Sequence, residues 1–361
     1  MQEPIGAASP TMRVGRGKPL AVCGVVLFVG LALYGALLPA TRATALVNAD
    51  AQTPPAVAAA NAFLDSLAAN QREKAVYEFG SSQKSRWSNL PVRMVPRNGV
   101  RMGDLTAAQR KLALEAVAAV LSKGGFQKIV DIMDADQKLA ESDRRGTGPN
   151  GMFGADRYYL AFFGKPSAEK PWMLQFGGHH LGLNVTVIGK HFVLTPTHTG
   201  AQPALFERNG KEVRPLGVEN DAAFKLVNAL DEAQRAKAIL GKRPQQELLL
   251  GPGRDGKKID PQGIKGSALS AEQQSMLVDL IAAWVTIVEP EAAATRLAEI
   301  RSGLGDTFFA WSGPTTKGSA VYFRIQGPSV VIEYAPQRGT GHIHTVIRNP
   351  HDDYGVAEIA R

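Results

Sequence analysis

The chain has 361 residues, of which 44% are hydrophobic and 20% charged, and its formal net charge is +8 at pH 7. This length is enough for one large or two modest globular domains. Acidic residues interleave with the basic ones, so we predict no nucleic-acid partner. The single cysteine, Cys23, excludes an intrachain disulfide and a cysteine-rich metal site, so a metal would need histidine, carboxylate or amide ligands.

Residues 1–45 have the layout of an export signal. Basic residues precede an apolar run from Leu20 to Leu38, and the small residues from Ala43 to Ala45 are typical of a cleavage site. The run is also nearly long enough to span a bilayer, so an uncleaved anchor in the inner membrane is the alternative. We therefore expect a periplasmic or extracellular protein, with membrane contact only through this segment. A linker is predicted over residues 46–56.

A repeated pattern organises the rest of the chain. The segment Leu105 to Arg110 recurs as Leu269 to Gln274. Thr106 and Ser270 are typical helix N-caps, and apolar residues follow each of them at helical spacing. We predict two copies of one unit, a first half over residues 57–215 and a second over residues 251–361. The region 216–250 is expected to join them through a single helix from Asp221 to Leu240.

Each copy continues into segments with strand propensity. These are Trp172–Phe176, Leu181–Ile188 and Phe192–Thr195 in the first half, and Val321–Gln326, Val330–Tyr334 and Ile343–Ile347 in the second. The repeat aligns Phe176 with Gln326. The first copy also contains a polar insertion from Glu141 to Gly151, which we predict to be a surface loop. We therefore expect an α+β fold in which each half consists of helices followed by an antiparallel sheet.

All seven histidines lie between residues 179 and 351, and four of them form two tight groups. His342 and His344 are two residues apart in a predicted strand, so both side chains should point to one face and present two imidazoles to one metal. Adjacent residues of an extended chain face opposite ways, so only one of His179 and His180 should meet that pair. The other is expected to reach Asn184 or a carboxylate.

The repeat aligns His342 and His344 with Phe192 and Leu194, so the two halves are expected to supply different ligands to one site between them. The alternative is that both groups are surface histidines beside glycine-rich turns. Gly177 and Gly178 should allow the backbone before the first group to turn sharply and approach a ligand.

Further candidates surround these groups. His198, Asn184 and Tyr354 are candidate substrate-binding residues. Arg348, Asp352 and Asp353 are candidate catalytic residues, because Arg348 supplies charge after the second group and Asp352 or Asp353 could orient a histidine or act as a general base. A turn around Asn349-Pro350 would explain the same residues equally well.

Several of these stretches resemble a bacterial family catalogued as domain of unknown function 3500. They are Leu105–Arg110, Phe176–Leu181, Gly251–Gly263, Leu269–Gln273, Phe309–Pro314, Arg324–Pro328 and His342–Gly355. The resemblance covers nearly all of the chain from Ala56 to Gly355, and Ser312 departs from it where a smaller residue is expected. Because that family has no assigned activity, the resemblance implies no catalytic role for any residue.

The sequence thus favours an exported protein with a transition metal ion, namely zinc, copper or iron, held by histidines between the halves. If the site is catalytic, hydrolysis of a small-molecule or peptide substrate by a metal-activated water is the simplest chemistry, followed by oxidation at copper or iron. One alternative is an envelope protein that binds a small ligand or metal without turnover. Another is metal-free acid–base catalysis in which His344 or His179 pairs with Asp352 or Asp353.

Overall fold

The structure is a computed structural model that describes residues 54–143 and 151–359. The predicted signal or anchor over residues 1–45, the predicted linker up to residue 53 and the segment 144–150 of the predicted loop lie outside the described residues. Within them, no helix combines the length and the apolar character that crossing a bilayer requires.

The first half contains four helices among the described residues, α1 (Pro55–Asp65), α2 (Ala69–Ala75), α3 (Ala107–Ala118) and α4 (Lys123–Ser142). Its strands are β1 (Val76–Tyr77), β2 (Val100–Arg101), β3 (Tyr159–Phe163), β4 (Trp172–Gly177), β5 (Leu181–Ile188), β6 (His191–Val193) and β7 (Thr197–Ala201). A small hairpin follows, made of β8 (Phe206–Arg208) and β9 (Lys211–Val213). Residues 141 and 142, predicted to belong to the surface loop, are instead the last turn of α4.

The predicted joining region contains α5 (Gly217–Ala229), α6 (Glu232–Ala238) and β10 (Ile239–Gly241), and the second half begins with β11 (Ile264–Lys265). It continues with α7 (Ala271–Val285), α8 (Pro290–Ser302), β12 (Phe308–Ser312), β13 (Tyr322–Gln326), β14 (Val331–Pro336), β15 (Ile343–Arg348) and α9 (Val356–Ile359). Thr106 and Ser270 cap α3 and α7 in matching capping boxes, as the repeated sequence predicts.

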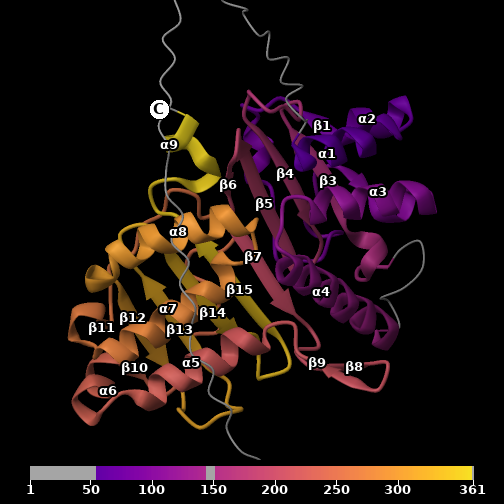
Figure 1. Cartoon of the computed structure of the whole chain (residues 1–361). Helices are drawn as coiled ribbons and strands as arrows, with labels where there is room; N and C mark the ends of the chain where they lie inside the picture. The colour runs from indigo at the N-terminus through magenta and orange to yellow at the C-terminus, as the bar shows by residue number, and fades with distance from the viewer. Residues whose placement is uncertain (1–53, 144–150, 360–361) are drawn as a thin grey trace, which may run out of the picture. The chain divides into compact units, whose positions relative to one another are not determined.

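The predicted α+β class is confirmed, but the halves do not form separate antiparallel sheets. A single 13-stranded sheet has ten strands in the order β1-β3-β4-β5-β7-β15-β14-β13-β12-β10, which cross the view from β1 to β10 in Figure 1. The other three strands pair beside this path, β2 with β3, β6 with β5 and β11 with β12. Antiparallel pairing of β7 with β15, for example His198 opposite Val346, joins the halves. The sheet is mixed, because β1 runs parallel to β3 and β10 runs parallel to β12.

The order of elements is similar in the two halves, but their common origin stays a prediction. The structure also shifts the predicted alignment. Phe176 pairs with Leu160 in the first half, and Ile325 pairs with Phe309 at the corresponding place in the second. The sequence alignment placed Gln326 at that position, one residue out of register. Since side chains alternate along a strand, this slip exchanges the two faces of the sheet.

The predicted single helix from Asp221 to Leu240 is wrong. The chain breaks at Leu230, whose ψ is 139°, and Asp231 then starts α6 with its own capping box to Gln234. Residues from α5, including Phe224, belong to the main hydrophobic core. The region 216–250 is therefore part of the packed fold rather than a simple connection.

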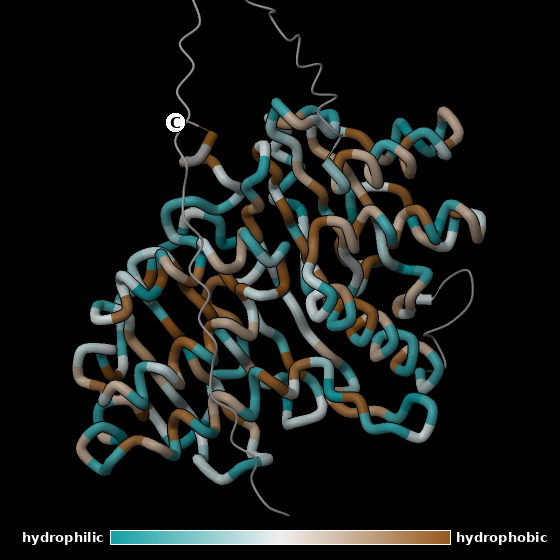
Figure 2. Tube along the Cα trace, in the orientation of Figure 1, coloured by the Kyte–Doolittle hydropathy of each residue, from teal (hydrophilic) through white to brown (hydrophobic). Residues whose placement is uncertain are grey.

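The two faces of the sheet differ in character. Leu160, Phe176 and Phe323 are members of the large core that also contains residues of the helices, and Figure 1 shows several of these helices lying over the strands. The colours alternate between teal and brown along α4 in Figure 2, as expected for a helix with one buried face.

The opposite face carries polar side chains, among them Gln175 and Arg348, and two long loops cover it. The loop after β1 accepts a hydrogen bond from Gln175 Nε2 at Lys84 O (2.8 Å), and the loop after β10 accepts one from Arg348 Nε at Leu250 O (2.6 Å). Polar groups are therefore buried beneath loops on this side of the sheet. Burial there requires a partner for each of them.

Candidate metal centre

Three imidazoles converge at one end of the central strands. His180 directly precedes β5, His342 directly precedes β15, and His344 is the second residue of β15. The Nε2 atoms of His180 and His342 lie 2.9 Å apart, and those of His342 and His344 lie 3.0 Å apart. The two histidine groups predicted to meet are thus in direct contact, although 162 residues separate His180 from His342.

Two glycines make room for rings at this end of the sheet, one for the imidazoles and one for a tyrosine. Gly200 on β7 lies opposite His344, and a Cβ at this position would stand 3.0 Å from His180 Cδ2 and 3.1 Å from His344 Cδ2. A Cβ on Gly178 would lie only 2.7 Å from the ring of Tyr158. Gly178 therefore allows a close approach of the backbone to a tyrosine ring, and the predicted approach to a ligand stays a prediction.

A buried carboxylate orients His180. Asp136 on α4 lies with Oδ1 2.5 Å from His180 Nδ1, and its Oδ2 accepts a hydrogen bond from Tyr158 Oη at 2.7 Å. Both His180 and Asp136 are fully buried. A carboxylate that holds Nδ1 of an imidazole fixes the ring and raises its basicity at Nε2, which is the usual outer support of a histidine metal ligand.

The expectation that His179 and His180 face opposite ways is wrong, because the chain bends at residues 178–180 and the two ring centroids lie only 3.8 Å apart. His179 Nδ1 lies 3.7 Å from Asp136 Oδ1, and the His179 ring packs against Phe153 with 4.9 Å between centroids. The second member of the doublet therefore lies beside a carboxylate, one of its two predicted partners, rather than beside Asn184. Asp136, His179 and His180 form a second set of groups close enough to share an ion, completely buried.

The loop after β1 supports the same end of the sheet. The Asn89 amide lies 3.1 Å from His344 Nδ1. Arg97 donates from Nη2 to the carbonyl of Gly178 at 2.8 Å and to that of Ser88 at 2.8 Å, which fastens the loop to the turn that carries the histidine doublet. The centre is thus supported from a helix, three strands and a long loop.

Burial keeps the imidazoles unprotonated near neutral pH. It lowers the pKa of His342 to about 4 and that of His198 to about 3, and it also lowers the pKa of His180 and His344. Burial raises the pKa of Asp136, against the attraction of His179 and the hydrogen bond from Tyr158. Neutral imidazoles offer lone pairs, which is the state that binds metals.

The hydrogen-bonding pattern leaves the three converging nitrogens incompletely matched. When the Nδ1–H of His180 donates to the Asp136 carboxylate, its Nε2 carries only a lone pair. The Nε2–H of His342 can then donate to His180 or to His344, but not to both. Of the two Nε2–Nε2 contacts of about 3 Å, only one can therefore be a normal hydrogen bond. In the other, the two nitrogens have either no proton between them or two. A positive ion bound to all three lone pairs would remove this mismatch.

A cleft leads to this centre. It has a volume of about 810 Å³, and its lining includes Lys138, Ser142, Gln202, Arg338 and His342. Among the three converging histidines, His342 is the one that is only partly buried, whereas His180 and His344 are buried. The imidazole of His342 therefore forms the boundary between the centre and the solvent.

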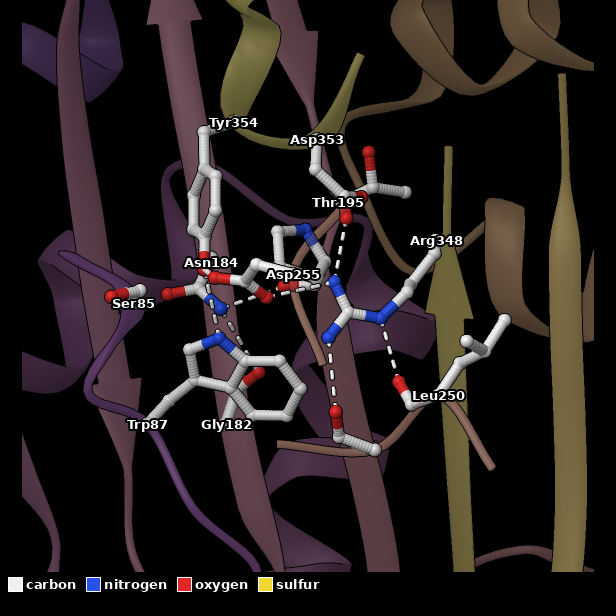
Figure 3. Close-up of polar contacts among 12 residues, drawn as sticks. Ser85, Trp87, Gly182, Asn184, Thr195, Leu250, Asp255, Arg348, Asp353 and Tyr354 are labelled. Atoms are coloured by element: carbon white, nitrogen blue, oxygen red, sulfur yellow. Dashed lines mark hydrogen bonds and ion pairs between the residues drawn. The ribbon is translucent and has the colours of Figure 1, made fainter. Parts of the chain in front are cut away.

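The predicted catalytic residues Arg348 and Asp353 lie elsewhere. Arg348 is four residues from His344 on β15, about 13 Å along the strand. Its Nη1 pairs with Asp353 Oδ2 at 2.6 Å and Asp255 Oδ1 at 2.9 Å, and its Nη2 donates to Gly251 O at 3.0 Å (Figure 3). Their catalytic role stays a prediction and does not enter the proposed function.

Two more candidates lie beside Arg348. Tyr354 Oη accepts a hydrogen bond from Trp87 Nε1 and donates to Asp255 Oδ2, both at 3.0 Å, as Figure 3 shows. Asp352 Oδ1 accepts the backbone N–H of Ala357 at 2.6 Å, at the start of α9. The contacts of Tyr354 join the C-terminal segment of the described chain to the loops after β1 and β10, whereas that of Asp352 is local to the segment.

Asn184 and His198 differ in their relation to the centre. Asn184 belongs to an amide network, in which its Oδ1 accepts from Gln175 Nε2 at 2.7 Å and its Nδ2 donates to Pro196 O at 2.6 Å. His198 is close to the centre, with its ring centroid 5.2 Å from that of His344. Its Nδ1 lies 2.7 Å from Thr345 O, while its buried Nε2 has no hydrogen-bond partner among the described residues.

The sequence analysis missed Asp136, Tyr158 and Asn89. A readable signal existed for Asp136, because it lies at helical spacing from Ile132 and Met133 on the buried face of α4. A carboxylate on an apolar helix face is rarely buried without a partner. Asn89 carries no such signal, since it lies in a loop without regular spacing.

Comparisons with known proteins add a family but no activity. No curated protein matches the chain, and no solved structure matches it. A family model described as "Protein of unknown function (DUF3500)" matches residues 49–356, which is most of the chain. The chain therefore belongs to this family of proteins of unknown function, as the resemblance of its motifs indicated.

Proposed function

We propose that the Nε2 atoms of His180, His342 and His344 hold one divalent transition metal ion. The observation that carries the proposal is the short distance from His342 Nε2 to His180 Nε2 (2.9 Å) and to His344 Nε2 (3.0 Å). When Asp136 is ionised, no arrangement of protons makes both of these contacts hydrogen bonds. Tetrahedral zinc with bonds of about 2.0 Å places its ligand atoms about 3.3 Å apart, so the imidazoles would need to move apart only slightly to bind the ion. A borderline metal such as zinc, copper or iron fits three imidazoles.

Three protein ligands and an access route favour catalysis over storage. Catalytic zinc sites keep a position open for water or substrate, and the cleft reaches the centre at His342. A bound ion would lower the pKa of its water and supply a nucleophile near neutral pH. The Asp136–His180 contact would tune that ion through the ligand. Metal-dependent hydrolysis is therefore the activity we propose.

A second candidate is metal binding without turnover. His198 favours it, because its buried Nε2 has no hydrogen-bond partner among the described residues and its ring lies against that of His344. A shift of this ring could supply a fourth nitrogen and close the coordination sphere. Replacing His198 by glutamine distinguishes the two candidates. A closed site would lose affinity for the metal, whereas a site open to water would retain it.

The test is elemental analysis of the purified protein after zinc loading and gel filtration. We expect one ion per chain in the wild type and none in a His342→Ala, His344→Ala double variant that keeps its circular dichroism spectrum. The matched control replaces the exposed residues His191 and His351 by alanine and should keep the ion. Wild-type protein without stoichiometric metal, or a double variant that still binds it, would refute the metal centre.

We also propose that the protein is exported, which the residues before Ala45 support by their sequence pattern. Mass spectrometry of the protein from an envelope fraction measures the mass of the mature chain. Cleavage after Ala45 supports secretion, and an intact membrane-bound chain supports the anchored form. Recovery of the intact chain from the cytoplasm alone would contradict both.

A further inference from the structure

The geometry of the cleft points to a substrate that carries an oxyanion, either a carboxylate or a phosphate, with Arg338 as the residue that recognises it. This inference rests on the proposed metal centre and names the class of substrate that the centre would accept. The observations are the position of Arg338, its lack of a partner and the balance of charge around the cleft.

Arg338 is held beside the candidate centre by the turn between β14 and β15. The backbone N–H of Gln337 donates to the carbonyl of His342 at 2.7 Å and closes this turn. The N–H of Arg338 donates to Gln246 Oε1 at 3.0 Å, and Gln337 Nε2 donates to the carbonyl of Gln246. A guanidinium and a proposed metal ligand are therefore carried by one anchored turn, and both residues line the cleft.

The backbone of Arg338 is in an unfavourable conformation for its residue type. Its φ is +60°, in the left-handed region that glycine and asparagine adopt more readily than arginine. Strained backbone of this kind persists where surrounding bonds impose it, and it is concentrated at ligand sites. The exposed side chain of Arg338 has no hydrogen-bond or ion-pair partner among residues 54–143 and 151–359. Its donors are free for a ligand.

The opposite wall of the cleft is formed by α4 and adds a second cation. Lys138 follows the buried Asp136 by two residues, so one helix supports His180 from inside and carries an ammonium group at the rim. Lys138 pairs with Glu141 at 3.2 Å, but both side chains are about half exposed, so this pair is weak. Glu247 also lines the cleft and partly opposes the positive charge.

These charges favour an anion once a metal is bound. A divalent ion with Arg338 and Lys138 faces one lining carboxylate, Glu247, so the cleft has an excess of positive charge. A planar guanidinium binds carboxylate and phosphate oxygens through two parallel hydrogen bonds, which a lysine cannot reproduce. An oxyanion in the cleft could therefore contact the metal with one oxygen and Arg338 with others.

The experiment uses the full chain loaded with cobalt(II), whose visible absorption reports changes in coordination. Inorganic phosphate and acetate are titrated separately as probes, and neutral imidazole serves as a ligand without charge. In an Arg338→Gln variant we expect the dissociation constant for phosphate to rise about tenfold, the effect of losing one charge-assisted contact. Imidazole should bind both proteins equally. Arg301→Gln is the matched control, because this exposed arginine does not line the cleft.

The outcomes separate this inference from the metal centre itself. Wild-type protein that binds no cobalt overturns both. Cobalt binding with a spectrum that neither phosphate nor acetate changes overturns the oxyanion inference alone, and so does equal weakening in Arg338→Gln and Arg301→Gln. A response to phosphate but not acetate, or the reverse, identifies which oxyanion the cleft prefers and supports the inference.

Discussion

Two polar clusters lie along β15, and they differ in how well their groups are matched. Around Arg348, which is 4% exposed, carboxylates and carbonyl oxygens surround a guanidinium, so donors face acceptors. At the other end of the strand, His180, His342 and His344 present nitrogen atoms to one another. A matched buried cluster stabilises the fold, whereas an unmatched one requires another explanation, and the one we propose is a metal ion.

The largest expected effect is that of acid on the metal-free protein, because several buried imidazoles contribute together. The pKa of His198 is about 3 and that of His342 about 4 in the folded state, below the value of about 6.5 in the unfolded chain. Between these values the unfolded chain binds more protons, so the free energy of unfolding should fall as the pH drops from about 6.5 to 4. Urea unfolding of chelated protein at several pH values measures it.

Burial also raises the pKa of Asp136, and this opposes the effect of the histidines in part. A His198→Gln variant should show a shallower dependence on pH, while a His351→Ala variant, which changes an exposed residue, should match the wild type. A free energy of unfolding that is constant over this pH range would show that the imidazoles are protonated in the fold.

Breaking the matched cluster should cost stability without affecting metal content. An Arg348→Met variant leaves Asp255 and Asp353 without their cation and two carbonyls without their donor, so we expect the free energy of unfolding to fall by about 3–5 kcal/mol. Zinc stoichiometry at low temperature should remain that of the wild type. Loss of zinc from a variant that is still folded would show that the two clusters are coupled.

The carboxylate behind His180 tests the unmatched cluster more finely. An Asp136→Asn variant keeps the size of the side chain but removes the charge that orients His180, so metal affinity should fall about 10–100-fold. Competition with a chelator of known affinity measures the change. A Lys111→Gln variant alters an exposed charge on a neighbouring helix and should bind zinc as the wild type does. Unchanged affinity in Asp136→Asn would place the metal away from His180.

The smallest expected effect concerns a histidine outside both clusters. His191 is exposed at the start of β6, so His191→Ala should change the free energy of unfolding by no more than about 0.5 kcal/mol. Thermal unfolding beside the wild type is the measurement. A larger change would mean that exposed histidines contribute to stability, and the contrast between buried and exposed imidazoles would fail.

The sequence predicted the parts of the centre that depend on local rules. The two-residue spacing of His342 and His344 follows from the geometry of extended chain, and the structure places their Nε2 atoms 3.0 Å apart. The same geometry did not apply to His179 and His180, because the chain bends at residues 178–180 and brings their rings together. The capping boxes at Thr106 and Ser270 were equally predictable, because a cap depends on neighbouring residues.

What the sequence did not predict depends on tertiary packing. The pairing of β7 with β15 joins the halves into one sheet, and no local pattern specifies it. The loop that brings Asn89 to His344 has no periodicity from which its path could be inferred. Arg348 and Asp353 were grouped with the histidines because they are close in sequence. An extended strand, however, rises by about 3.3 Å per residue, so a few residues are enough to separate two side chains that point to the same face.

The seam between β7 and β15 has a consequence for how the molecule matures. One imidazole of the centre, His180, comes from the β5 side of this seam, and the other two come from the end of the described chain, directly before and within β15, the last strand of the sheet among the described residues. A ribosome-bound chain that ends before His342 therefore holds a single imidazole of the three. If the proposed ion binds these three imidazoles, a product truncated before His342 would keep only one of the ligands.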